Sequence, residues 1–251
     1  MRLRLPLWCS GCLVAAMLVA CSGDALGPSV ATGASSQTSP TVSTPSPPQC
    51  PNPEGQACLG ELAPGTYTTT VFTPTLTYTV PVGWSNFEDT PGNFLLVPPR
   101  GSLAGVNRDT GDFIGVYSSI AAADGCPFNE APDVEQSASG IAGWMARNPG
   151  LAITNRHDVD NGGLQGVVFD IKMAKGWTKG CPYTHGVPLV PLIVGVGISG
   201  LEHGILPQSW TRLYLLDNPP QGVMAIEVVN VQEGDHLDEY SSVVEGMSFA
   251  S

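Results

Sequence analysis

The chain has 251 residues, of which 10 are Lys or Arg and 22 are Asp or Glu, so its formal net charge at pH 7 is −12. Such a charge repels nucleic acids and anionic lipid headgroups, which excludes nucleic-acid partners and favours cationic, neutral or metal-bearing ones. The length beyond the N-terminal tail and the globular composition predict one domain with its own hydrophobic core.

The N-terminus has the composition of an export signal. Arg2 and Arg4 precede an apolar run from Leu5 to Ala20, which is too short for a stable membrane-spanning helix. The run ends in Leu18-Val19-Ala20-Cys21, which resembles the lipobox of bacterial lipoprotein signals. The resemblance implies cleavage before Cys21, acylation of its thiol with palmitate-type chains, and a location on the extracytoplasmic face of the cell membrane. An ordinary secretory signal with a chance cysteine is the alternative.

The chain is therefore divided into three parts, of which residues 1–20 are the signal peptide. Residues 21–49 are rich in Ser, Thr and Pro and contain hardly any large apolar side chain. Because this segment cannot bury enough surface to offset the entropy lost on ordering, we expect a disordered tether. Residues 50–251 form the single globular domain.

Four cysteines follow the lipobox: Cys50, Cys58, Cys126 and Cys181. An even number of cysteines in an exported protein predicts two disulfides. Three pairings are formally possible, and we favour Cys50 with Cys58 and Cys126 with Cys181. A metal site is a poor alternative, because the cysteines lack C-x₂-C spacing and export favours oxidation.

The first half of the domain shows strand patterns and one helix pattern. Large side chains alternate in 76–80 and 113–120, and an apolar run at 94–97 stops at two prolines. A helix is predicted behind Asp133 as N-cap, with Gln136 as its capping-box partner, up to the Asn-Pro-Gly that begins at residue 148.

The second half begins with a predicted β-hairpin. Segments 151–159 and 164–173 flank Asp160-Asn161-Gly162-Gly163, whose residues tolerate positive φ. Further apolar segments recur at 189–196, 212–216 and 223–231. A final helix is predicted behind Asp235, with an apolar stripe formed by Leu237, Tyr240, Val244 and Met247. The order of strands, helix, hairpin, strands and helix predicts an α+β fold with an antiparallel β-sheet flanked by helices.

This order resembles the PsbP-like α/β/α sandwich. The resemblance rests on the strand that ends in Val80-Pro81-Val82-Gly83-Trp84, the strand at Phe113-Ile114-Gly115-Val116-Tyr117, and the final helix that ends in Met247-Ser248-Phe249. It covers roughly residues 65 to 250. It implies no catalytic residue, because members of this family mostly bind or scaffold other molecules.

Three motifs suggest chemistry, but each has a simpler interpretation. The G-x-G-x-x-G at 195–200 is followed by Gly204 and Pro207 where a dinucleotide-binding helix should begin, so we expect a loop between strands. The acidic run at 158–163 lacks the final carboxylate of a calcium loop and is predicted to be the hairpin turn. Ser199, with a histidine and Asp170, could form a hydrolytic set on paper, but its surroundings do not match a nucleophile elbow.

The most promising segment for binding is 176–186, which contains Trp177, Tyr183 and His185 beside a predicted disulfide. Loops held by a rigid scaffold are common binding sites, and aromatic side chains make good contact anchors. Equally, the two aromatic side chains could merely cover one end of the sheet. We expect a non-catalytic binding or scaffold module for a protein, glycan or lipid, without a cofactor, a catalytic set or a metal. An envelope hydrolase or metal-dependent enzyme using His185 or His203 is the alternative.

Overall fold

The computed structural model describes residues 59–101, 105, 111–231 and 234–250. The predicted signal peptide, the tether with Cys21, and both Cys50 and Cys58 lie outside these residues. Within the described ranges, no helix is long and apolar enough to cross a lipid bilayer.

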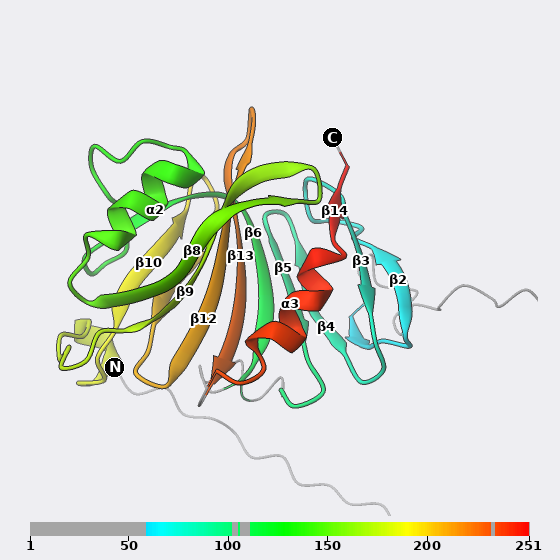
Figure 1. Ribbon diagram of the computed structural model, residues 1–251, viewed down its shortest axis with the longest axis horizontal. Helices are drawn as coiled ribbons and strands as arrows, with labels where there is room; N and C mark the ends of the chain where they lie inside the picture. The colour runs from blue at the N-terminus through cyan, green and yellow to red at the C-terminus, as the bar shows by residue number, and fades with distance from the viewer. Residues whose placement is uncertain (1–58, 102–104, 106–110, 232–233, 251) are drawn as a thin grey trace, which may run out of the picture. The chain divides into compact units, whose positions relative to one another are not determined.

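Most strands belong to one antiparallel sheet, with the order β1-β4-β5-β6-β13-β12-β9-β8 (Figure 1). Three further strands leave this path: β10 pairs with β6 and β11, and β7 pairs with β6. The strands are β1 (Gly60–Glu61), β4 (Ser85–Thr90), β5 (Asn93–Val97), β6 (Phe113–Asp124), β7 (Asn129–Glu130), β8 (Leu151–Asn161), β9 (Leu164–Met173), β10 (Val190–Gly195), β11 (Glu202–Ile205), β12 (Ser209–Asn218) and β13 (Gly222–Val231).

A smaller sheet and three short helices complete the described part of the chain. The smaller sheet has the order β14-β3-β2. Its strands are β2 (Gly65–Thr68), β3 (Leu76–Val80) and β14 (Ser248–Phe249). The helices are α2 (Ala138–Ala146), α3 (Leu237–Glu245) and the 3₁₀-helix η1 (Pro182–Thr184).

The main sheet is covered on both faces, and each cover forms its own hydrophobic core. On one face, Ile226 of β13 packs in a cluster with Tyr240 of α3 and with side chains of the small sheet. On the other face, Ala225 of β13 packs in a cluster with Ile141 of α2 and with side chains of β10. Because neighbouring residues of a strand point to opposite faces, β13 is buried along nearly its whole length.

The predicted α+β class is wrong, because the protein is mostly β. Strands contain 49% of the described residues, whereas helices contain 12% and only two α-helices are described. Several strands that the sequence pattern did not indicate contribute to this difference, among them β4 and β11. Strand β4 carries Asn86, Glu88 and Asp89, and β11 carries Glu202 and His203, so neither has the apolar alternation by which a strand is recognised.

Helix α2 is shorter than predicted because its N-cap is different. Asp133 has a φ of 60°, outside the extended range that an N-cap residue adopts, so it does not form the predicted capping box with Gln136. Instead Ser137 is the N-cap, and its hydroxyl accepts a hydrogen bond of 3.1 Å from the Gly140 amide. The helix therefore has nine residues.

Two other local predictions are confirmed. The hairpin of β8 and β9 turns at Gly162 and Gly163, whose φ values are 62° and 88°. Helix α3 follows His236 rather than the predicted cap Asp235. The predicted apolar stripe is buried, with Leu237, Tyr240 and Val244 in the helix and Met247 just after its end.

One disulfide is present in the described residues, between Cys126 and Cys181, with a Cα–Cα distance of 5.5 Å. It joins residues that are 55 positions apart in the sequence. Around it, Phe128 and Leu189 pack with Cys181 in a small third cluster. The structure therefore shows one bridge and not the predicted two, and the expected Cys50–Cys58 pair lies outside the described residues.

A salt bridge connects β9, β12 and α3. The Arg212 Nε donates to the Asp170 Oδ1 at 2.7 Å, and its Nη1 donates to the Asp238 Oδ1 at 2.7 Å. Burial alone would raise the pKa of Asp170, but hydrogen bonds from Arg212 and Asn155, together with the positive charge of Arg212, outweigh it and lower this pKa. Asp170 is thus a structural group and not part of a hydrolytic set.

Candidate functional site

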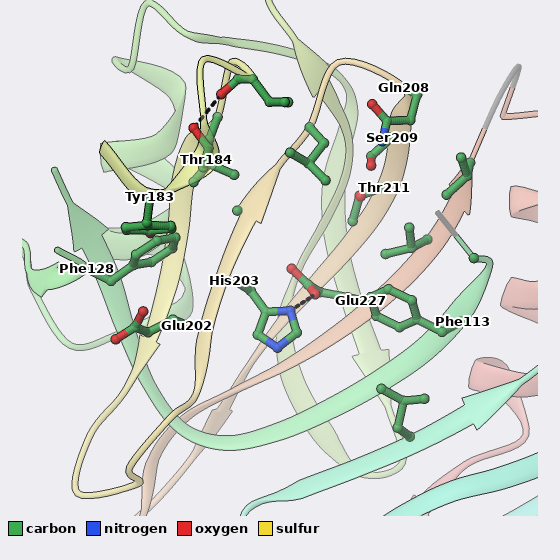
Figure 2. A pocket seen from close by; sticks show the side chains of 18 residues that line it. Phe113, Phe128, Tyr183, Thr184, Glu202, His203, Gln208, Ser209, Thr211 and Glu227 are labelled. Atoms are coloured by element: carbon green, nitrogen blue, oxygen red, sulfur yellow. Dashed lines mark hydrogen bonds and ion pairs between the residues drawn. The ribbon is translucent and has the colours of Figure 1, made fainter. Parts of the chain in front are cut away.

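A cavity of about 620 Å³ lies between β11 and the face of the main sheet that α2 also covers (Figure 2). Its walls come from β6, β11, β12 and β13 and from the loop that contains Tyr183. Its described lining includes the aromatic side chains Phe113, Phe128 and Tyr183 and the carboxylates Glu202 and Glu227, but neither Lys nor Arg. The cavity is therefore aromatic and acidic.

The cavity exists because β6 pairs with two different strands in succession along one of its edges. Residues 114–117 of β6 pair with β5, and residues 120–122 pair with β10. Between them Ser119 has a φ of 50°, and the register with β13 shifts at this point. Such irregularities bend a strand, so β10 and its partner β11 depart from the plane of the sheet. The residues of β11 consequently lie above β13 instead of beside it.

Glu227 is the most unusual residue of this site. It lies in the middle of the apolar strand β13, between Ile226 and Val228, and is only 3% exposed. Its Oε2 is 3.0 Å from Nδ1 of His203, whose side chain is 25% exposed. A buried carboxylate is unfavourable unless it is paired, so the contact with His203 compensates part of the desolvation of Glu227.

The His203 imidazole lies among aromatic rings. Its centre is 4.3 Å from the ring centre of Tyr117 and 6.4 Å from that of Phe113. With Glu227 on Nδ1, these rings fix the orientation of the imidazole. His203 is therefore held as a positioned polar group at the wall of the cavity.

Tyr117 lies beneath this pair. Its side chain is fully buried. The hydroxyl lies close to Gly115, where an added Cβ would overlap it. Burial and then the negative charges of Glu227 and Glu88 raise the pKa of Tyr117, so the phenol remains neutral.

The outer wall is formed by the loop that the disulfide holds. Tyr183 is 52% exposed and lines the cavity together with Phe128, which packs near the disulfide. Figure 2 shows Tyr183 and Phe128 close together, with Glu202 near them. Burial and the charge of Glu202 raise the pKa of Tyr183. On the opposite wall, Ser209 and Thr211 of β12 add hydroxyl groups.

The structure separates the three loop residues that were predicted to form one binding site. Tyr183 lines this cavity, whereas Trp177 lines a second cavity near α2. His185 lies on the surface, in a left-handed conformation with a φ of 51°, and lines neither. His203, predicted only as a residue of the alternative enzyme, joins Tyr183 in the first cavity.

The hydrolytic set considered from the sequence does not come together. Ser199 is an exposed residue between β10 and β11, and Asp170 is paired with Arg212. Among the described residues, no three His, Cys, Asp or Glu side chains are placed to hold a metal ion. What the site contains is a positioned acid–imidazole pair in an aromatic cavity.

Sequence reasoning missed Glu227, Tyr117, Phe113 and Phe128. A signal for Glu227 was present, because it is the only charged residue in Gly222–Val231, a strand otherwise made almost entirely of apolar residues. A lone charge in such a strand must be desolvated, which is unfavourable without a partner or a function. The three aromatic residues had no comparable signal, since aromatic side chains in strands usually belong to the core.

Comparison with known proteins finds distant structural similarity. No protein-family profile and no curated protein matches the sequence. The structure is similar to cyanobacterial PsbP from Synechocystis sp. PCC 6803, with a TM-score of 0.34, 13% identity, and coverage of 75% of this chain and 93% of that one. It is also similar to a protein from Bacteroides thetaiotaomicron VPI-5482, with a TM-score of 0.32 and 12% identity; the match covers 70% of this chain but only 45% of that protein. A PsbP is thus among the distant structural neighbours, and similarities this low assign neither a function nor a site.

Proposed function

We propose that this protein is a lipid-anchored binding module of the bacterial envelope, and that the cavity between β11 and the main sheet is its binding site. The lipobox ending in Cys21 supports the anchor and the extracytoplasmic location. The observation that supports the site is the buried Glu227, which contacts His203 at the wall of an aromatic cavity.

The chemistry of the walls favours a small organic amine or ammonium ion with an apolar body. Glu202 and Glu227 supply negative charge, and the described lining contains no cationic side chain that would neutralise them except by protonation of His203. Phe113, Phe128 and Tyr183 offer rings that attract cations through their π faces. A volume of about 620 Å³ lies in the range of small-molecule sites.

Calorimetric titration of the full-length protein in detergent tests this proposal with two matched probes. We expect 2-phenylethylamine to bind and 3-phenylpropionate, the corresponding anion, to bind at least about tenfold more weakly. Glu227→Gln should weaken binding of the amine about tenfold, because it removes a buried charge that the cation contacts. Glu61→Gln, which changes an exposed acid outside the cavity, is the control with the same net charge.

Three results would contradict the proposed site: no saturable binding of the amine, equal binding of both probes, or equal effects of the two variants. The anchor is tested separately by mass spectrometry of the intact protein from its native membrane. We expect Cys21 to be the acylated N-terminal residue. A protein of unmodified mass would contradict the anchor but not the site.

An enzyme is the second candidate, because a carboxylate hydrogen-bonded to an imidazole is the usual arrangement of a general base and its orienting acid. The distance of 3.0 Å between His203 and Glu227 supports this possibility. Here a bound water would be the nucleophile. Ester or amide hydrolysis by the full-length protein that disappears in His203→Gln would favour the enzyme over the binding module.

A further inference from the structure

A second cavity, of about 560 Å³, also borders the disulfide cluster. It is bounded by the C-terminal end of α2, by residues 124–126 at the end of β6, and by Trp177, Lys179 and Gly180 of the disulfide-linked loop. Leu189 lines both cavities. The two sites are thus neighbours with a shared wall, but their chemistry differs.

Two tryptophans form part of the second cavity. Trp144 comes from α2 and Trp177 from the loop. The indole Nε1 of Trp177 donates a hydrogen bond of 3.2 Å to the Leu189 carbonyl oxygen. The ring also packs against Gly150, where an added Cβ would lie 3.1 Å from it. Trp177 is therefore held in one orientation, which reduces the entropy lost when a ligand binds.

Two cations accompany the tryptophans, although the chain has a net charge of −12. Lys179 has its Nζ 5.2 Å from the centre of the Trp177 ring, and Arg147 follows the last turn of α2. Neither makes a salt bridge to another described residue, and Asp124 is the only described acid of the lining. Arg147 also complements the dipole at the end of α2, whereas Lys179 contacts the Trp177 ring.

We propose that this second cavity binds an acidic saccharide, such as a short chain of uronic acids. The apolar C–H face of a sugar ring packs on a flat indole, and a carboxylate can pair with Arg147 and Lys179. A simple anion would use the two cations but not the two tryptophans. The proposal does not depend on the amine site, because the cavities present charges of opposite sign.

Titration of the full-length protein in detergent, followed by tryptophan fluorescence and calorimetry, tests the proposal. Trigalacturonate should bind saturably, and its trimethyl ester, which keeps the sugar rings but lacks the charges, should bind at least about tenfold more weakly. Lys179→Gln and Arg147→Gln should each weaken binding about fivefold to tenfold. Lys175→Gln, an exposed lysine of the same segment that does not line the cavity, should have no effect.

The proposal fails if trigalacturonate does not bind saturably below about 10 mM, if the ester binds equally well, or if Lys179→Gln behaves like Lys175→Gln. If 3-phenylpropionate binds more tightly than trigalacturonate, the saccharide proposal is wrong and the ligand class is an aromatic anion. Because Lys179 is exposed, its variant should keep the stability of the wild type. Binding of 2-phenylethylamine should also be unchanged in this variant, which separates failure here from failure of the amine site.

Discussion

Replacing Glu227 with methionine should stabilise the protein while weakening amine binding. Methionine has a similar length and volume, so the substitution removes the charge without opening a large void. The Glu227 side chain is 4% exposed, and burial of a carboxylate to this degree costs several kcal/mol in lost hydration. Its contact with His203 offsets about 1.5–3 kcal/mol of this cost, as is usual for a charged hydrogen bond.

The difference predicts that Glu227→Met raises the free energy of unfolding by about 1–3 kcal/mol. For a domain of this size, the melting temperature should rise by roughly 3–10 °C.

Urea denaturation and thermal unfolding of the full-length variant measure this effect. Val229→Met, at the next position of β13 on the same face, controls for the effect of a methionine in this wall. If Glu227→Met lowers the free energy of unfolding by more than about 1 kcal/mol while Val229→Met stays close to the wild type, Glu227 is retained for stability. In that case the main physical argument for a binding site at this position would be refuted.

Three further perturbations test the fold. Replacing both Cys126 and Cys181 with alanine should lower the free energy of unfolding by about 4 kcal/mol, the loop-entropy value for a separation of 55 residues, as measured by urea denaturation. The pKa of Asp170 is lowered in the folded protein, so the ionised carboxylate stabilises the fold above about pH 4 and this stabilisation is lost as the pH falls further. The variant Asp170→Asn should therefore lose less stability on acidification than the wild type. Gly115→Ala should destabilise the protein by about 1–3 kcal/mol in the same assay, because the new methyl group would overlap the Tyr117 hydroxyl.

Parts of the fold could be predicted from the sequence because they depend on neighbouring residues. The hairpin turn at Gly162 and Gly163 needs positive φ, and few other residues tolerate it. The stripe that includes Tyr240 and Val244 predicts a helix with one buried face, and α3 has that face. These features require no knowledge of which distant segments lie near them.

The fold class and the site were decided by long-range contacts. Strand β4 has a polar pattern, and pairing with β5 and β1 makes it a strand. Glu227 meets His203 only because β10 pairs with the end of β6 and carries β11 across the sheet. A local sequence pattern indicates which side chains of one segment are buried, whereas a cavity depends on which distant segments a bent strand brings together.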